Sequence, residues 1–198
     1  MGDFYERFVD VEVDAGEAGP LAERMVEWLV SEGVLTRERS AEGMYSSQVR
    51  TGYVPGPRWH EAVSDPSDPG WLPGPVAVLV GRDYHVGGQG ADEPDAVVCP
   101  GCGKRTVIVD YPESFEPDEE AWRRFREAIA VWKETGEGVL ACSTCGVPVR
   151  LTDWQFASGF DLGALAFDFW GWPPLSVAFR EEFRRRLGHR MEEQMGKL

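Results

Sequence analysis

Two short stretches with the same pattern, Cys-Pro-Gly-Cys-Gly at residues 99–103 and Cys-Ser-Thr-Cys-Gly at residues 142–146, determine how the middle of this chain can fold. A C-x-x-C turn places two sulfur atoms on one side of a tight loop, where backbone N–H groups can donate to the thiolates. The glycine after each second cysteine fits the positive φ with which the chain leaves such a turn. Two such turns together supply four thiolates in a tetrahedron, the closed geometry of structural zinc. We therefore expect one structural zinc ion bound by Cys99, Cys102, Cys142 and Cys145.

Short apolar runs flank both turns and predict strands on either side of each. They are Val97-Val98 and Val107-Ile108-Val109 around the first turn, and Val139-Leu140 and Val147-Pro148-Val149 around the second. On these residues, the segment 97–151 resembles a zinc-ribbon module. The 39 residues between Cys102 and Cys142 exceed the usual spacing of roughly 15–20. A helix predicted over 116–136 accounts for the excess as an insertion, which favours a ribbon integrated into the main core.

Two other chemistries can use the same four cysteines. Rubredoxin-like iron sites are built from the same paired turns, and the softness of the ligands does not separate iron from zinc. Disulfide redox chemistry is the second, but a thioredoxin-type C-x-x-C begins a helix, whereas a glycine follows each second cysteine here. Because four cysteines leave no open position for water or substrate, we expect a structural metal rather than a catalytic one. Lys104, Arg105 and Arg150 lie beside the turns and can offset the negative charge of the thiolates or contact an anionic partner.

The composition is that of an acidic globular protein. The 198 residues include 20 Lys and Arg against 34 Asp and Glu, and the net charge is −14. Residues 1–100 carry −11 of this charge and residues 101–198 carry −3. A field this negative repels phosphates and anionic membranes, so it argues against nucleic acid or a membrane surface as a partner. The simplest interpretation is that the charge keeps the protein soluble, and the sharper one is that it attracts a basic protein.

No segment of the sequence predicts export or membrane insertion. No run approaches the roughly 18 apolar residues that a bilayer span requires. The first six residues lack the basic head and the apolar stretch of a secretory signal. We therefore expect a cytoplasmic protein, and in that reducing compartment four cysteines are more often metal ligands than disulfides.

The N-terminal region predicts a strand followed by a helix. Alternating apolar and acidic residues over 8–14 are typical of a half-buried strand, with an inward face formed by Val9, Val11 and Val13. Gly19-Pro20 opens the helix and Gly33 ends it. The apolar face of this helix holds Leu21, Met25, Trp28 and Leu29.

Residues 40–75 predict irregular structure, because six prolines and the turn-forming run 64–70 interrupt any long element. Tyr53, Trp59 and Trp71 indicate that this stretch packs against the core. Residues 76–80 predict a buried strand, and 87–95 a flexible acidic loop. In the predicted helix over 116–136, Pro117 stands at the start and Gly136 at the end, and the apolar stripe consists of Trp122, Phe125, Ile129 and Trp132.

The C-terminal region repeats the order of the N-terminal one. Leu165, Phe167 and Phe169 alternate with other residues as in a strand. Ser176 can cap a helix that Gly188 ends, and the apolar face of that helix holds Phe179, Phe183 and Leu187. Five arginines make the helix basic, which indicates a solvated face or, alternatively, docking against the acidic N-terminal half.

These elements predict an α+β protein in which a mixed sheet with flanking helices receives an inserted four-cysteine zinc ribbon. The N-terminal part of the core is expected over 1–96, the ribbon over 97–151 and the C-terminal part of the core over 152–198. The two terminal strand–helix units would share one sheet. The segment 162–175, with its Phe-Trp-Gly-Trp-Pro-Pro run, is similar to the C-terminal part of a group of uncharacterised bacterial proteins, and this resemblance implies no activity.

Familiar catalytic motifs are absent from the sequence. It contains no phosphate-binding glycine loop, no G-x-S-x-G elbow and no H-E-x-x-H pair. We therefore expect a non-enzymatic zinc protein that binds another protein in a regulatory or immunity-type role. The alternatives are nucleic-acid binding through the ribbon, and an enzyme with a dispersed site near His60, Asp83, Tyr84 and His85. Each of these histidines has an ordinary surface or hydrogen-bonded role as its simpler interpretation.

Overall fold

A computed structural model of the chain describes residues 4–46, 48–66, 72–88, 92–111 and 113–197. The chain divides into two compact units. The first comprises Met1–Gly81 and Gly163–Leu198, and the second comprises Arg82–Leu162. The second unit contains the whole predicted ribbon segment 97–151 and extends beyond it at both ends. Each unit has its own buried apolar cluster.

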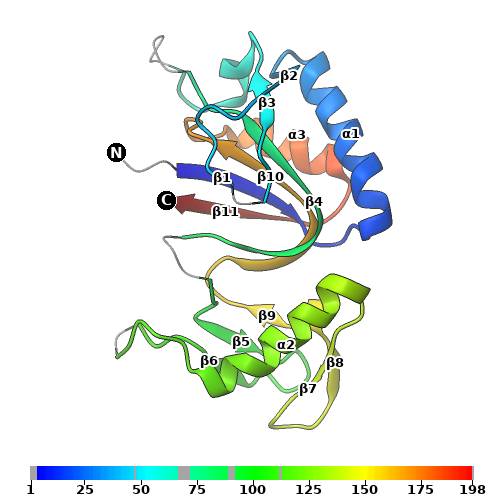
Figure 1. Ribbon diagram of the computed structural model, residues 1–198, viewed down its shortest axis with the longest axis vertical. Coiled ribbons are helices and arrows are strands. Elements are labelled where there is room, and N and C mark those ends of the chain that lie inside the picture. Colours follow the sequence, from blue (N-terminus) through cyan, green and yellow to red (C-terminus); the bar gives the residue numbers. More distant parts are fainter. Residues whose placement is uncertain (1–3, 47, 67–71, 89–91, 112, 198) are drawn as a thin grey trace. The chain divides into compact units, whose positions relative to one another are not determined.

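The first unit is built on a large antiparallel sheet (Figure 1). Its elements are β1 (Phe4–Asp10), α1 (Ala15–Ser31), β2 (Leu35–Ser40), β3 (Gly52–Pro55), the 3-10 helix η1 (Trp59–Ala62), β4 (Val76–Val86), β10 (Phe160–Trp170), α3 (Val177–Leu187) and β11 (Met191–Lys197). Both β4 and β10 extend across the unit boundary, so that residues 82–86 and 160–162 belong to the second unit. The six strands have the order β11-β1-β10-β4-β3-β2. The predicted α+β class is confirmed, but the sheet is antiparallel rather than mixed. The strands of the two predicted strand–helix units, β1 and β10, are direct neighbours that run in opposite directions.

Strand β1 differs from its prediction in extent and in burial. It spans Phe4–Asp10 rather than 8–14, and it is paired on both sides, with β10 and with β11. Phe8 packs into the larger apolar cluster, whereas Val9, its neighbour, packs into a second cluster with Trp170. Successive residues of a strand point to opposite faces, so both faces of the sheet are covered here. A half-buried strand was therefore the wrong expectation.

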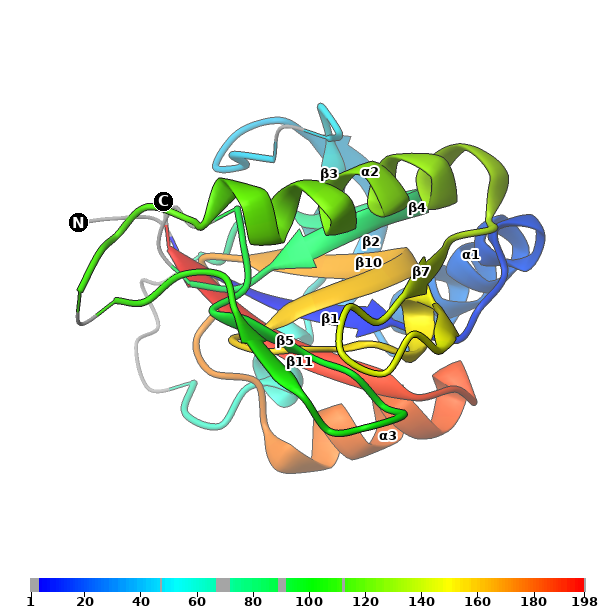
Figure 2. The ribbon, with the colours of Figure 1, turned by 90° about the horizontal axis from the view of Figure 1, so that it is seen from below.

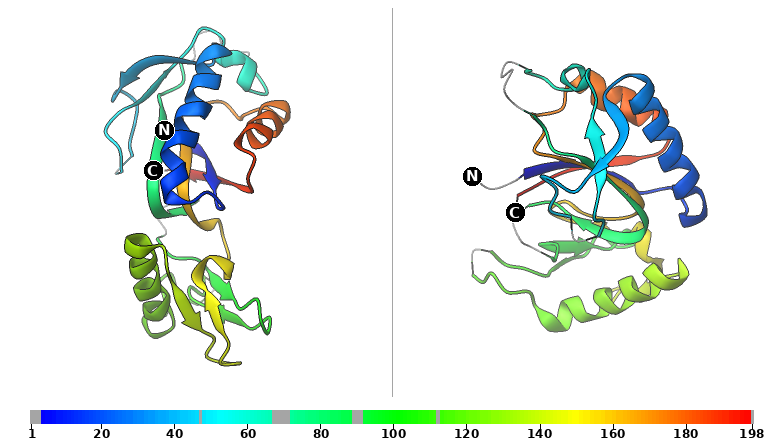
Figure 3. Two further views of the ribbon diagram at one scale, coloured as in Figure 1. Left: turned by 90° about the vertical axis from the view of Figure 1, so that its right-hand side faces the viewer. Right: turned by 45° about the horizontal axis from the view of Figure 1, so that its top comes forward.

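Helices α1 and α3 pack together on one face of the sheet (Figure 3, left). The Trp28 ring of α1 stacks on Phe179 of α3, with 6.0 Å between the ring centroids. Phe183 lies under them, fully buried, against the rings of Phe8 and Phe167. The predicted apolar faces of both helices are buried as expected. The aromatic rings of this core each bury a large apolar area.

The ends of these helices follow local signals, with one exception. Gly33 has φ +73°, and Val34 N–H donates to Leu29 O at 2.9 Å, the bond that closes a Schellman turn. Ser176 Oγ accepts from Phe179 N–H, and Gly188 ends α3 at φ +78°. The start of α1 was predicted at Gly19-Pro20, but the helix begins at Ala15, with Pro20 inside it. Ala18, before the proline, is fully buried, so packing extends the helix against the local preference.

The predicted irregular stretch 40–75 contains a strand that the sequence did not indicate. Residues 52–55 form β3, which pairs with both β2 and β4. Tyr53 and Trp59 pack against the larger apolar cluster, as expected. Trp71 and residues 67–70 of the predicted turn run lie outside the described residues, as do 89–91 of the predicted acidic loop.

Buried charges in the first unit are paired across strands. Arg7 and the fully buried Asp168 face each other in the β1–β10 register and form a bidentate ion pair of 2.5 and 2.7 Å. Glu6, also buried, accepts from the Leu175 N–H and pairs with Arg180 at 2.7 Å. Burial raises the pKa of Glu6, although both of these partners act in the opposite direction. Arg180 therefore does dock against the N-terminal strand, whereas its neighbours on α3 pair with exposed acids.

The second unit combines short strands with one long helix (Figure 2). Its elements are β5 (Ala96–Val98), β6 (Arg105–Val107), α2 (Glu119–Thr135), β7 (Val139–Ala141), β8 (Pro148–Arg150), the 3-10 helix η2 (Leu151–Asp153) and β9 (Gln155–Phe156). The strands form a sheet of order β6-β5-β9 and a separate β7–β8 pair. None of the helices in the described part of the chain is long and apolar enough to cross a bilayer.

Helix α2 confirms its predicted apolar stripe and shifts its predicted start. Trp122, Phe125, Ile129 and Trp132 are all buried. The helix begins at Glu119 because Asp118 is the N-cap, whose carboxylate accepts from the N–H groups of Glu120 and Ala121 at 3.0 Å. Pro117 therefore precedes the helix. Gly136 ends it at φ +81°, as predicted.

Candidate metal centre

Two β-hairpins carry the two C-x-x-C turns. The first is formed by β5 and β6, with Val98 paired to Arg105, and the second by β7 and β8, with Ala141 paired to Pro148. Three of the four apolar runs that flank the turns thus form strands where the sequence predicts them. The fourth strand, β6, lies at Arg105–Val107 and leaves Ile108 and Val109 of the predicted run outside it. In each hairpin the strands end one residue before the first cysteine, so that both cysteines of a pair lie in the connecting turn.

The two turns share one backbone hydrogen-bond pattern. In the first, Cys99 N–H donates to Lys104 O at 3.0 Å and Gly103 N–H donates to Cys99 O at 2.9 Å. In the second, Cys142 N–H donates to Val147 O at 3.0 Å and Gly146 N–H donates to Cys142 O at 2.8 Å. Both glycines have φ near +70°, which is a conformation that favours glycine. The turns are therefore two copies of one local structure, as their sequences predict.

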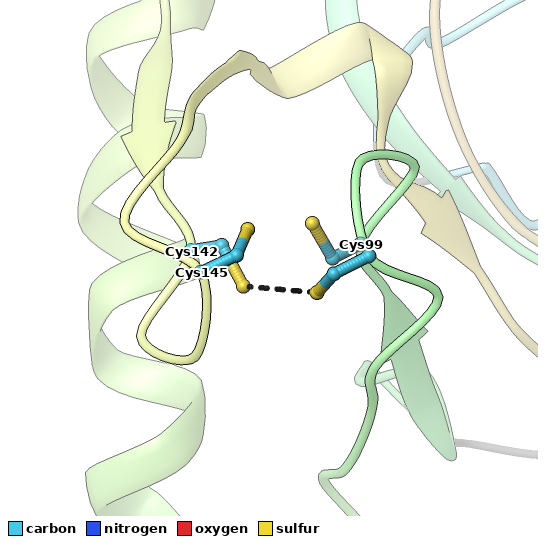
Figure 4. A group of neighbouring side chains, drawn as sticks. Cys99, Cys142 and Cys145 are labelled. Atoms are coloured by element: carbon cyan, nitrogen blue, oxygen red, sulfur yellow. Dashed lines mark hydrogen bonds between the residues drawn. The ribbon is translucent and has the colours of Figure 1, made fainter.

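The four sulfur atoms gather at a single point between the hairpins (Figure 4). All four Sγ atoms lie within 4.8 Å of one another, and Cys102 Sγ is 3.8 Å from Cys142 Sγ. All four cysteines are free thiols, because none forms a disulfide. The four cysteines that the sequence pairs two by two are thus brought together across 39 intervening residues.

The spacing of the sulfurs matches that of a tetrahedral metal site. With Zn–S bonds of about 2.3 Å, the edge of a regular tetrahedron measures about 3.8 Å, which equals the distance between Cys102 and Cys142. A disulfide would need an S–S distance of about 2.05 Å. The four cysteines are therefore positioned to hold one metal ion, and soft thiolate donors of this kind select zinc, iron or Cu(I) rather than a hard cation.

Burial differs between the first and the second cysteine of each turn. Cys99 and Cys142 are buried, with 1% and 5% of their surface exposed, and both belong to the apolar cluster of the second unit. Cys102 and Cys145 are exposed. The site therefore joins the core on one side and faces solvent on the other. Arg124 of α2 donates to Ala141 O, which fixes the helix to the strand that leads into Cys142.

The ionisation of the thiols is uneven. Hydrogen bonds from the backbone N–H groups of Cys145 and Thr144 lower the pKa of Cys142 to about 6. The N–H of Lys104 also lowers the pKa of Cys102, but desolvation and hydrogen bonds with the neighbouring thiols outweigh it and raise that pKa to about 11. Four adjacent thiolates repel one another, so all four ionise together only when a cation supplies the compensating charge.

The basic residues beside the turns are exposed, and one of them, Arg150, is already in an ion pair. Arg150 forms a two-bond ion pair with Asp153, at 3.0 and 3.1 Å, so its charge is already compensated within the unit. Lys104 and Arg105 follow Cys102 in the first turn and are exposed. The exposed side of the site thus carries positive charge next to Cys102.

Of the four residues named for a dispersed active site, His85 is buried, and the other three have packing or ion-pair contacts. His60 is in η1 of the first unit and its ring contacts Trp59. In the second unit, Asp83 pairs with Lys133 at 2.6 Å, and the Tyr84 ring stacks on Phe160 with 5.4 Å between centroids. Burial, followed by the charges of Asp92 and Asp83, raises the pKa of Tyr84. These contacts pack and anchor the side chains of β4.

A carboxylate–imidazole pair in the first unit was not predicted from the sequence. Buried Asp10 accepts from the N–H groups of Glu12 and Val13 through Oδ1, and its Oδ2 lies 2.8 Å from Nδ1 of His189. The two residues are separated by 179 positions, and β11, which follows His189, was not predicted. No local pattern of the sequence could have indicated this pair.

Comparisons with known proteins add no relative to this picture. No protein-family model matches the chain, and searches of curated proteins and of solved structures find no match. The resemblance of 97–151 to zinc-ribbon modules and that of 162–175 to a bacterial protein group stay predictions. The interpretation of the four-cysteine site therefore stands on its geometry and its chemistry.

Proposed function

We propose that Cys99, Cys102, Cys142 and Cys145 bind one structural zinc ion, and that the chain is a non-enzymatic cytoplasmic protein that binds a basic protein partner. The observation that carries the metal assignment is the gathering of four sulfurs within 4.8 Å from two identical turns. Four thiolates complete the tetrahedron of zinc, so no position remains for a reacting water or substrate. The arrangement supports a metal that holds structure rather than one that catalyses.

The position of the cysteines in the second unit supports a structural role. Its strands β5 to β8 have only three residues each, and small cores with short elements commonly depend on a metal or disulfides. Two of the four ligands also belong to the buried cluster. Metal binding at such a site contributes directly to the free energy of folding, because the unfolded chain does not present the four thiolates together.

The charge of the chain supports a basic partner. The net charge is −14, and most of it lies in residues 1–100. Such a field accelerates association with a positively charged protein and opposes association with phosphates. A regulatory or immunity-type protein that neutralises a basic partner would use the charge in this way.

The metal assignment is tested by the metal content of the purified chain. We expect one zinc per chain by elemental analysis, and we expect Co²⁺ substitution to give the intense visible bands of a tetrahedral thiolate site. Cys102→Ser removes one exposed ligand without opening the core, whereas Ser143→Ala changes the second turn and keeps all ligands. Zinc should be lost in the first variant and retained in the second. Bound iron with a rubredoxin-type spectrum would show that the metal is iron and not zinc. A chain that keeps its fold without any metal would refute the proposal.

The partner is tested by affinity capture with the zinc-loaded chain at low and high salt. A basic protein that binds in a stable ratio, and is released as ionic strength rises, would support the proposal. Capture of nucleic acid in place of protein, or of no macromolecule at all, would contradict it.

A further inference from the structure

A pocket lies within the first unit, on residues that the metal site does not use. Its volume is about 670 Å³, which is within the range of small-ligand sites in proteins. Its walls come from the end of β2, from the turn after β3, from the turn before β4 and from the end of β10. All of the residues that line it belong to the first unit.

Two Pro-Gly-Pro turns line this pocket. They are Pro55-Gly56-Pro57 and Pro73-Gly74-Pro75. Because Tyr53 of β3 pairs with Val76 of β4, both turns stand at the same end of the sheet. A Cβ at Gly56 would come within 2.3 Å of Gly33 O, and one at Gly74 within 2.8 Å of Trp170 O. Only glycine fits at either position, so the walls are held by close backbone packing.

The lining offers few hydrogen-bond donors. Four of its members are prolines, which have no N–H group. Three further N–H groups already donate within the protein, those of Gly56 to Val34 O, Gly74 to Trp170 O and Gly171 to Phe4 O. The Glu42 N–H donates to Ser40 Oγ at 3.0 Å. The indole N–H of Trp170 is buried without a partner and is one of the few spare donors in the described lining. Such a lining is poorly suited to an anion, because carboxylates and phosphates need several N–H or O–H partners.

The side chains of the lining favour a positive charge. Among the described residues that line the pocket, Glu42 is the one with a charged side chain, and none is Lys, Arg or His. Trp59 supplies an aromatic wall; its ring packs at 85° against Trp172, which is buried and donates from Nε1 to Gly74 O at 2.9 Å. A carboxylate beside a tryptophan ring and proline surfaces is the environment that stabilises a cation with an apolar stem.

We propose that this pocket binds an organic cation, a guanidinium or primary ammonium group on an aliphatic stem. The charged group pairs with Glu42, and the stem lies against Trp59 and the proline turns. The proposal goes beyond the function proposed above and does not rest on it, since no cysteine and no metal takes part. The same chemistry occurs in a free amine and in the arginine or lysine side chain of a protein, and the choice of probes separates these two sources.

In the test, the full chain is titrated with four probes. Binding is measured by calorimetry and by the shift of the NMR signal of the Trp59 indole. Agmatine represents the free cation and N-acetyl-arginine N-methylamide the protein-borne one. The corresponding citrulline compound is neutral and of similar shape, and the corresponding glutamate compound is negative. We expect at least one cationic probe to bind and to shift the Trp59 signal, the citrulline compound to bind at least about tenfold more weakly, and the glutamate compound not to bind. Tighter binding of agmatine assigns the pocket to free amines, and tighter binding of the capped arginine assigns it to protein side chains.

A pair of matched variants separates the pocket from the overall charge. Glu42→Gln removes the proposed counter-ion, whereas Glu38→Gln removes one exposed carboxylate of β2 that does not line the pocket. We expect Glu42→Gln to weaken binding of the cationic probe about tenfold and Glu38→Gln to change it less than about twofold. Equal losses in the two variants, equal affinity for the citrulline compound, or no binding of either cation at about 10 mM would each overturn the proposal.

Discussion

The two units of this chain reach a folded state by different means. Around β1 and β10 the first unit gathers 25 described residues into its main buried cluster, and the central strands are covered on both faces. The cluster of the second unit has 14 described residues, two of which are Cys99 and Cys142. Since stabilisation grows with the apolar area removed from water, the first unit has a sufficient core of its own. The second unit has short strands around a small core, and we infer that the metal supplies the difference.

The largest expected effect follows from removing a buried ligand in the second unit. Structural zinc contributes roughly 10–16 kcal/mol in small zinc-dependent folds, which is comparable to the whole stability of a typical domain, about 5–15 kcal/mol. Cys142→Ser should therefore unfold residues 97–151 and leave the first unit folded. The measurement is the dispersion of backbone amide signals in an NMR spectrum, which should collapse for the second unit only.

Ser143→Ala is the control for this variant, because Ser143 is exposed in the same turn and holds no thiolate. Its spectrum should match that of the parent chain. If the signals of 97–151 stayed fully dispersed in Cys142→Ser, the second unit would not depend on the metal site for its fold, and the proposed difference between the units would be wrong.

The next largest effect concerns the stability of the first unit and the Arg7–Asp168 ion pair within it. Asp168→Leu leaves Arg7, which is 11% exposed, without its counter-charge, and breaking such a pair costs about 3–5 kcal/mol. The double variant Arg7→Met with Asp168→Leu removes both charges and should recover most of the loss. The free energy of unfolding of both variants is measured by urea unfolding, monitored by the NMR signals of β1. The zinc content should be unchanged in both. A double variant as unstable as the single one would show that the charged pair itself is needed.

A smaller effect compares the same helix ending in both units. Gly188 ends α3 at φ +78° with open space around it, so Gly188→Ala should cost about 1 kcal/mol from backbone strain alone. Gly136 ends α2 at φ +81°, and there a Cβ would come within 2.5 Å of the Arg82 guanidinium. The guanidinium is the far end of a flexible side chain and can move away, so Gly136→Ala should cost about as much as Gly188→Ala. Thermal unfolding of the two variants measures both costs, and a much larger cost at Gly136 would contradict a movable Arg82 side chain.

The smallest effect concerns an exposed ion pair on α3. Hydrogen bonds from Arg185 and Arg186 lower the pKa of Glu182 to about 2. A carboxylate with a lowered pKa stabilises the fold above its usual pKa of 4.5 and loses this contribution as the pH falls through about 2. Glu182→Gln should thus be slightly less stable than the parent at pH 7 and equal to it near pH 2, and added salt should reduce the difference. Thermal unfolding at the two pH values decides this, and a difference that grows in acid would have the wrong sign.

The sequence predicts best what neighbouring residues decide. Gly33, Ser176 and Gly136 end or begin helices where expected, because caps depend on a few adjacent backbone groups. The two C-x-x-C-G turns have the same hydrogen bonds for the same reason. Their meeting in space was also predictable, since four cysteines with matching turns have one chemistry that unites them.

The sequence predicts least where distant segments decide. β11 carries two glutamates, a glutamine and a lysine, so its pattern does not resemble a strand, yet it pairs with β1 over seven residues. The same pairing covers the free edge of β1 and brings His189 to Asp10. The sequence does contain a signal for the pocket, because the tripeptide Pro-Gly-Pro occurs twice. Prolines in a sequence indicate only that a helix or strand is interrupted, however, and not that they line a pocket.

Hydrogen exchange of the full chain, with its metal bound and after its removal by a chelator, tests the central claim most directly. We expect the backbone amides of 97–151 to lose their protection from hydrogen exchange when the metal is removed and to regain it when zinc is returned. Amides of β1 and α3 should exchange at the same rate in both states. Unchanged protection in 97–151, or a parallel loss in both units, would contradict the claim that one ion bound by four sulfurs holds the second unit in its fold.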